Sequence, residues 1–212
     1  MLASDNVMTY PQIDDLANKL RDAARKHRDE IDQGDAQEGL RSENIGMRLF
    51  AEFRRIVDEL KKRIVHIVTV DRTRTPQQAL DACGRRQYVD KKVVAAMPRG
   101  TGDKAKLVYF KPGPECYEGS LISCSKVAEE YKKRKLRPDP QAQIDDNAAK
   151  PEFADSTPNG CQWVDEQGNY CCASFDRWFD ERHVHVYRLG VHVWRDEWSF
   201  AGVPEESSAS AV

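Results

Sequence analysis

The stretch Cys161-Gln-Trp-Val-Asp-Glu-Gln-Gly-Asn-Tyr-Cys-Cys-Ala-Ser-Phe175 decides the fold of the C-terminal part of the chain. Two runs of strand-forming residues flank Glu-Gln-Gly, which predicts a β-hairpin with Gly168 in the left-handed conformation. In this register Trp163 lies opposite Cys171. Alternate side chains of a strand share one face. The predicted core face consists of Cys161, Trp163, Cys171, Ala173 and Phe175.

A near-repeat follows this hairpin: Val184-His-Val-Tyr-Arg188 and Val191-His-Val-Trp-Arg195. The two arms predict a second hairpin that turns at Leu189-Gly190. Period-two alternation then places the valines on a core face and the His, Tyr and Trp side chains on the other face. The chain from Asn159 onward is therefore expected to form an antiparallel β-meander.

The polar face of the second hairpin carries the candidate metal ligands. Imidazole and carboxylate groups on one sheet face can bind Zn or Fe. The candidate set is Glu181, His183, His185 and His192. Two alternatives stay open: exposed strand residues without a ligand, or an aromatic surface for a partner protein. That partner surface consists of Tyr187, Trp194 and Trp198.

Outward from these strands, the N-terminal part is helical. Apolar residues recur at spacings of three and four over 12–32 and again from Ser42 to Ile64. Residues 33–39 contain two glycines and are expected to break the helix between them. The pattern predicts an antiparallel helical hairpin over 1–64, which packs on the rest of the chain or self-associates through residues 12–62.

The middle of the chain mixes helices and strands. β-Branched residues over 64–70 predict a strand buried on both faces, and 106–110 predict another strand. Capping residues predict short helices at 77–83 and 123–135. A helical turn is also expected at 91–97, and a weaker helix at about 140–149. The predicted fold class is α+β. The predicted domains are the helical hairpin 1–64, an α+β domain 65–204 with one core, and a disordered tail 205–212. Within the α+β domain, 65–150 is the basic α/β part and 151–204 the acidic β-meander.

The net charge of −2 hides a strong asymmetry along the chain. Residues 1–60 carry 9 basic and 13 acidic side chains, residues 61–137 carry 19 and 8, and residues 138–212 carry 5 and 14. The basic middle predicts contact with a polyanion such as nucleic acid, or with an acidic protein. Alternatively, the acidic third neutralises it within the chain. The candidate polyanion-binding residues are Arg72, Arg74, Arg85, Arg86, Lys91, Lys92, Arg99 and Lys104.

Composition and motifs limit the remaining possibilities. No run of about 18 apolar residues is present, so we expect no membrane span. The first residues lack the pattern of a secretory signal, which predicts a soluble, cytoplasmic protein with six free thiols. No hydrolase or metalloprotease motif is present, and no catalytic residue is predicted. The sequence thus favours a non-catalytic binding or accessory protein. The alternatives are a small metalloenzyme and a structural subunit that assembles through its N-terminal helices.

Overall fold

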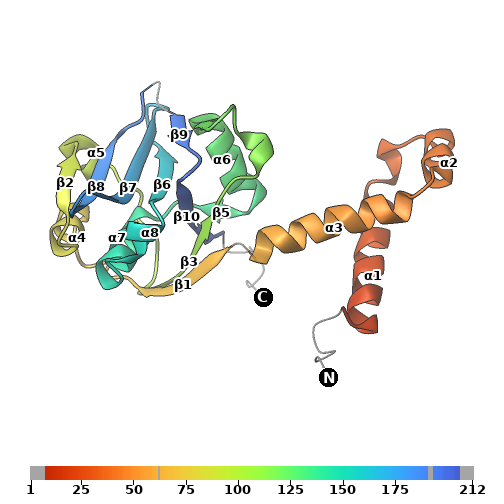
Figure 1. The fold of residues 1–212 in the computed structure, drawn as a ribbon, viewed down its shortest axis with the longest axis horizontal. Helices are drawn as coiled ribbons and strands as arrows, with labels where there is room; N and C mark the ends of the chain where they lie inside the picture. The colour runs from red at the N-terminus through yellow and green to blue at the C-terminus, as the bar shows by residue number, and fades with distance from the viewer. Residues whose placement is uncertain (1–7, 62, 191–192, 206–212) are drawn as a thin grey trace. The chain divides into compact units, whose positions relative to one another are not determined.

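A computed structural model describes residues 8–61, 63–190 and 193–205. The chain divides into two compact units, Met1–Asp58 and Glu59–Val212. Helices together with a mixed sheet confirm the α+β class (Figure 1). In the part of the chain that the structure describes, no helix has the length and apolarity to cross a membrane. Most of the tail predicted to be disordered lies outside the described residues.

The first unit is helical. It contains α1 (Tyr10–Lys26), a 3₁₀ turn (Arg28–Glu30), α2 (Gln33–Arg41) and α3 (Ile45–Lys61), which ends past the boundary between the units. The predicted break over 33–39 was wrong, because this stretch forms α2. The Asp32 carboxylate accepts a hydrogen bond from the Gly34 N–H at 2.7 Å and caps that helix. No residue of α1 or α2 is buried, so the packing of a helical hairpin stays a prediction.

The second unit is built on one large mixed sheet. Its strands lie in the order β1, β3, β10, β6, β7, β8, β2, and β5 pairs with β10. Their bounds are β1 Ile64–Thr69, β2 Arg86–Val89, β3 Lys104–Phe110, β5 Leu136–Arg137, β6 Asn159–Val164, β7 Tyr170–Trp178, β8 Glu181–Arg188 and β10 Ser199–Pro204. The pairs β10–β6 and β2–β8 are parallel, and the other pairs are antiparallel.

Helices cover both faces of this sheet (Figure 1). Helices α4 (Pro76–Ala82), α5 (Lys91–Ala95), α7 (Pro140–Ala149) and α8 (Phe153–Ser156) contribute to the core cluster that contains Phe175 of β7. Cys172 points to the opposite face and packs in a second cluster with Val127 of α6 (Cys124–Lys133). A 3₁₀ turn (Pro114–Cys116) and a small sheet of β4 (Leu121–Ser123) and β9 (Val193–Arg195) complete the unit.

The predicted hairpin over 161–175 is present as β6 and β7. Trp163 pairs with Cys171, in the expected register, and Gly168 has the expected positive φ of 82°. Four of the five predicted core residues lie in one buried cluster, and Cys161 is buried in a neighbouring one. Local alternation and a local turn were therefore sufficient to predict this element.

The predicted hairpin over 184–195 was wrong. The two-residue turn Phe179-Asp180 returns the chain onto β7, so β7 and β2 occupy both edges of β8. Strand β9 pairs with β4 instead. The alternation on β8 was correct, because Val184 and Val186 are fully buried on the core face. Residues 191 and 192, which belong to the predicted second arm, lie outside the described residues.

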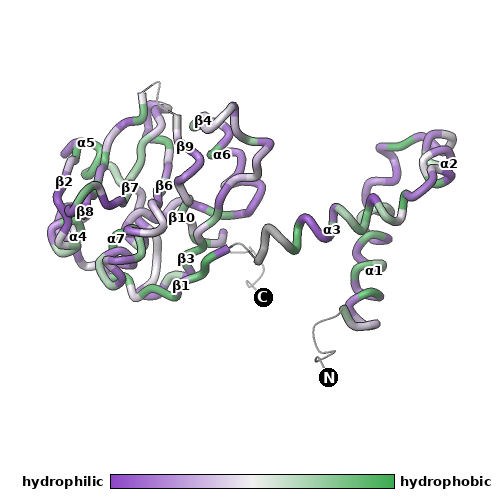
Figure 2. Tube along the Cα trace, in the orientation of Figure 1, coloured by the Kyte–Doolittle hydropathy of each residue, from purple (hydrophilic) through white to green (hydrophobic). Residues whose placement is uncertain are grey.

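Strand β1 was predicted to be buried on both faces, and this was also wrong. It is the end strand of the sheet, and most of its side chains are exposed. The Ile67 side chain is 70% exposed and Val65 is 45% exposed, whereas Val68 is buried. Figure 2 shows β1 as hydrophobic. Strand β1 is therefore an edge strand that exposes apolar side chains.

Candidate metal site on the edge of the sheet

The β7–β8 hairpin brings a carboxylate and two imidazoles together. In its register Asp176 faces His183, and Ser174 faces His185. Facing residues of antiparallel strands point to the same side, and residues two apart on a strand do so as well. Asp176, His183 and His185 therefore share the face opposite the buried valines of β8.

The three side chains have the spacing of a metal ligand set. The Asp176 Oδ1 atom lies 3.6 Å from Nδ1 of His183 and 3.7 Å from Nε2 of His185. One ligand atom from each residue lies within 4.8 Å of the other two. Ligand atoms bound about 2.0–2.2 Å from a tetrahedral zinc ion are about 3.3–3.5 Å apart. The two distances from Asp176 Oδ1 are close to this spacing, so a contraction of the cluster around an ion would place the three atoms at three corners of a tetrahedron.

Two atoms of the cluster are buried and make no hydrogen bond within the described part of the chain, although they lie within ion-pair distance of each other. Asp176 Oδ1 and His183 Nδ1 have no hydrogen-bond partner among the described residues. Buried polar atoms in native proteins almost always have a partner, and an orphan often marks a water molecule or an ion. These are the same two atoms that face each other across the cluster. The residues present therefore fit a bound cation.

Glu181 supports His183 from outside the cluster. Its Oε2 atom lies 3.5 Å from Nε2 of His183 and accepts a hydrogen bond from Arg86 Nη1 at 2.6 Å. The hydrogen bonds from Arg86 and then from His183 lower the pKa of Glu181, so it stays a carboxylate. Histidines that bind metals commonly donate their second N–H to a carboxylate. The structure therefore places Glu181, predicted as a ligand, behind the candidate ligand His183.

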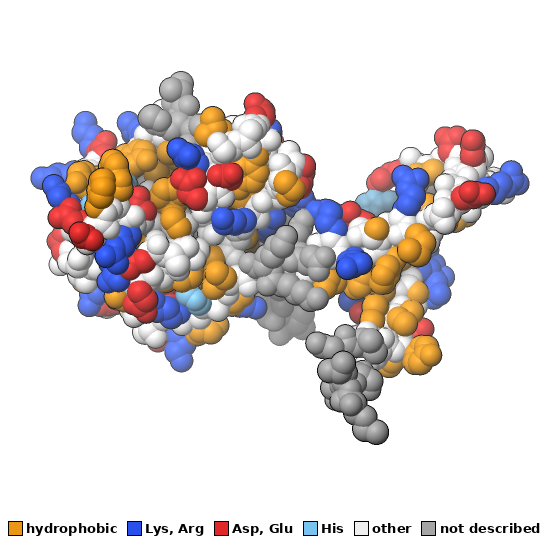
Figure 3. Space-filling view, in the orientation of Figure 1, with side chains coloured by type: hydrophobic (Ala, Val, Ile, Leu, Met, Phe, Trp, Pro, Cys, Tyr) orange, Lys and Arg blue, Asp and Glu red, His pale blue; other side chains and the backbone are white. Residues whose placement is uncertain are grey.

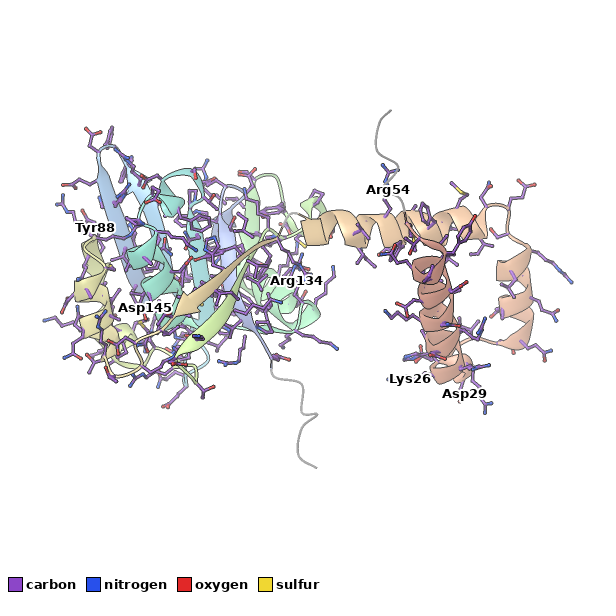
Figure 4. The ribbon with its side chains drawn as sticks, turned by 90° about the horizontal axis from the view of Figure 1, so that it is seen from below. Lys26, Asp29, Arg54, Tyr88, Arg134 and Asp145 are labelled. Carbon is purple, nitrogen blue, oxygen red and sulfur yellow. The ribbon has the colours of Figure 1, made fainter. Side chains whose placement is uncertain are left out.

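Tyr88 of β2 lies beside both histidines. It pairs with His185 across the parallel strands, and the two rings stack at 5.1 Å and 12°. Its ring meets the His183 ring edge-on at 5.5 Å. Figure 4 shows Tyr88 at the outer edge of the sheet. The side chains of Asp176 and His185 are each 26% exposed, so one side of the cluster is open to solvent.

Sequence reasoning missed Asp176 and named His192. The predicted strand ended at Phe175, three residues before the end of β7, and so did not reach Asp176, and His192 lies outside the described residues. The missing signal was the position of the turn. Once the turn is placed at 179–180, the pairing of 176 with 183 follows from counting outward along both strands.

The predicted aromatic surface for a partner is not continuous. Trp194 is only 4% exposed, and its indole N–H donates to Gln162 Oε1 at 2.8 Å. Its ring covers Gly160, where a Cβ atom would lie 2.5 Å from the ring. Trp198 is partly buried against it, and Tyr187 is 37% exposed. Trp194 is therefore a core residue, because β9 folds back over the sheet rather than extending β8.

Most arginines of the predicted polyanion surface have partners within the chain. Arg72 donates to both oxygens of the buried Asp139, at 2.5 and 2.9 Å. Arg85 is buried and donates to the backbone carbonyls of Pro151 and Asp176. Arg86 pairs with Glu181.

The remaining members of that set differ in their surroundings. Arg74 pairs with Asp71, and Arg99 donates to the backbone carbonyls of Arg72 and Arg74. Lys91, Lys92 and Lys104 are exposed. The pairs Arg72–Asp139 and Arg86–Glu181 join the basic middle to the acidic third, and Figure 3 shows both signs intermixed on the visible face. Polyanion binding stays a prediction, and this pairing removes much of its support.

The six cysteines are free thiols. Burial raises the pKa of the Cys161 and Cys172 thiols well above the ordinary value, which keeps them protonated and unreactive. Among the described residues, one group of three or more possible metal ligands lies close together. It consists of Asp176, His183 and His185 and contains no cysteine. The five buried cysteines therefore serve as small apolar core residues, and Cys116 is partly exposed.

No relative supplies a function for this arrangement of side chains. Metal binding is supported by the register of β7 and β8, the spacing of three ligand atoms and the two buried atoms without a hydrogen bond among the described residues. Comparison with protein-family models, with curated proteins and with solved structures finds no match to this chain.

Proposed function

We propose that the protein binds one divalent transition-metal ion, preferably zinc, through Asp176, His183 and His185. The observation that carries the proposal is the Asp176 Oδ1 atom. It is buried, has no hydrogen-bond partner among the described residues, and lies 3.6 and 3.7 Å from one nitrogen of each histidine. A cation bound between these three atoms would satisfy all of them.

The ligand set and its spacing select the class of metal. Calcium and magnesium prefer sites made of oxygen ligands, so two imidazoles disfavour them. Two histidines and one carboxylate suit both zinc and ferrous iron. Adjacent ligands of an octahedral ion at about 2.1 Å are about 3.0 Å apart, which is farther from the observed distances than the tetrahedral spacing. The geometry therefore favours zinc.

Three protein ligands would leave the fourth corner for water or a substrate atom. Zinc sites of this kind are catalytic, and the ion activates its bound water at neutral pH. The partial exposure of His185 and Asp176 gives a small molecule a route to that corner. Within this proposal, Glu181 orients His183 and Arg86 holds Glu181 in place. The function that follows is that of a small metalloenzyme, and the metal site is its first testable element.

The test is elemental analysis and competitive zinc titration of untagged, full-length protein. We expect about one zinc ion per chain, with affinity reduced at least about 100-fold by Asp176→Asn or His185→Gln, since each replaces a strong ligand by a neutral amide, a larger loss than a change behind a ligand. Glu181→Gln should reduce affinity by a factor of about 10 to 100, as changes behind a ligand do. Zinc content should not change in His27→Gln, because His27 is exposed and pairs with Glu30 in the first unit.

Two results would overturn the proposal. One is wild-type protein that takes up no zinc under conditions in which it is folded. The other is stoichiometric zinc that Asp176→Asn and His185→Gln leave at wild-type affinity, which would move the ion to another site. Circular dichroism of each variant separates loss of the site from loss of the fold.

A further inference from the structure

The helices of the first unit expose apolar side chains in a regular pattern. On α1, Ile13 is 46% and Leu20 is 45% exposed, and on α3 Leu49 is 49% and Ile56 is 44% exposed. Figure 3 shows hydrophobic side chains gathered on these helices. Surface of this kind on amphipathic helices marks an interaction site. The question is which partner would cover it.

The spacing of the apolar residues has the period of a coiled coil. On α1, Ile13, Leu16 and Leu20 follow intervals of three and four. On α3, Leu49, Phe53 and Ile56 follow intervals of four and three. These are a and d positions of a heptad, which pack against a second helix of the same period. Both helices have 17 residues, so their lengths match.

The charged residues beside the two stripes are complementary. With Leu16 and Leu20 at d and a, Lys19 occupies position g of α1. With Leu49 and Phe53 at d and a, Glu52 occupies position g of α3. In an antiparallel pair of helices the two g positions face each other, and charges there select partner and orientation. The opposite charges at g favour the pairing of α1 with α3. They disfavour the pairing of two α1 helices or of two α3 helices, because like charges would then face each other.

One antiparallel register satisfies the apolar residues and the charges together. Setting Leu20 opposite Leu49 also sets Leu16 opposite Phe53 and Ile13 opposite Ile56. The same register brings Lys19 beside Glu52. A single register thus gives three apolar layers and one ion pair.

Among the described residues this pairing is not made within one chain. Lys19 instead pairs with Asp15 of its own helix at 2.7 Å, Glu52 pairs with Arg55 of its own helix at 2.5 Å, and no residue of α1 is buried. We infer that the occupant of the surface is a second copy of this chain, with α1 of each copy antiparallel to α3 of the other. A two-fold axis makes both contacts at once. The result is a four-helix arrangement that buries both stripes.

The test measures the mass of untagged, full-length protein by light scattering and sedimentation equilibrium over about a hundredfold range of concentration. We expect the mass to rise from the monomer's 24.2 kDa toward twice that value. Leu20→Asp should abolish the rise. Leu40→Asp is the matched control, because Leu40 lies on α2, is 74% exposed and is outside both stripes.

Charge reversal tests the pairing itself. Lys19→Glu and Glu52→Lys should each weaken the dimer several-fold, and the double variant should restore it. A double variant no tighter than the single ones would overturn the α1–α3 pairing. A mass of one chain at every concentration would overturn self-association altogether. Thermal unfolding of each variant confirms that the second unit is intact, and zinc content is an independent readout that this inference does not predict to change.

Discussion

The two units differ in how far they bury their apolar side chains. In the second unit Leu80, Tyr109, Phe175 and Phe200 are each less than 2% exposed. In the first unit no residue of α1 or α2 is buried, and Leu40 is 74% exposed. Both regions show clear apolar periodicity in the sequence. Apolar periodicity therefore predicts which face of an element is apolar. Whether that face is buried in a core depends on how many other elements pack against it.

The same difference explains where the candidate site lies. A metal site needs ligands held within a fraction of an ångström, which paired strands backed by a core provide. Asp176, His183 and His185 stand on two strands whose other face is buried against helices. The first unit offers surface for association and no such support. We therefore expect the two units to respond differently to matched changes.

The largest difference should follow from removing a leucine. Leu80→Ala deletes a fully buried side chain from the core of the second unit, and should cost about 2–5 kcal/mol of unfolding free energy. Leu40→Ala changes an exposed residue and should stay within about 0.5 kcal/mol. Urea unfolding of both variants, followed by far-UV circular dichroism, which reports the helices of both units, measures this. Equal losses would contradict the contrast between the units.

A second comparison contrasts a buried ion pair with an exposed one. Arg72→Met leaves the Asp139 carboxylate, which is 1% exposed, without its bidentate partner and should cost about 3 kcal/mol. Arg74→Met breaks an exposed pair with Asp71 and should cost less than about 1 kcal/mol. Chemical unfolding of the two variants decides. If Arg72→Met proves as mild as Arg74→Met, the Asp139 carboxylate does not need this partner.

The sequence could predict the elements whose pairing is local. The hairpin over 161–175 has its turn and its alternation within fifteen residues, and both strands were recognised in the correct register. Helix α7 was also predicted over 140–149, after the prolines at 138 and 140, and the structure adds that Asp139 caps its start. The alternation on β8 was predicted as well, because it depends only on neighbouring residues.

Pairing between distant segments could not be predicted. Strand β2 has four residues, Arg-Gln-Tyr-Val, and only its contact with β8 makes it a strand. Strand β9 resembles β8 in sequence but pairs with β4, over seventy residues earlier. The candidate site was incomplete for two reasons. Tyr88 comes from the distant strand β2, whereas Asp176 lies only seven residues before His183 and was missed because the turn at 179–180 was not recognised.

The smallest effect is a pH dependence in the second unit. Asp155 accepts hydrogen bonds from Arg182 and Arg177, and mainly the Arg182 contact lowers the pKa of Asp155 below 3.8. A carboxyl with a lowered pKa in the folded state adds stability above its unfolded pKa, and this is lost as pH falls through the folded value. Asp155→Asn should therefore be less stable than wild type near neutral pH, and the gap should shrink toward zero below about pH 3. Asp15→Asn, which removes an exposed helix pair with Lys19, should show little gap at any pH. The urea midpoints of both variants and of wild type, measured across this pH range, test the two expectations. If the stability difference between wild type and Asp155→Asn grows in acid, the Asp155 carboxylate destabilises the folded unit.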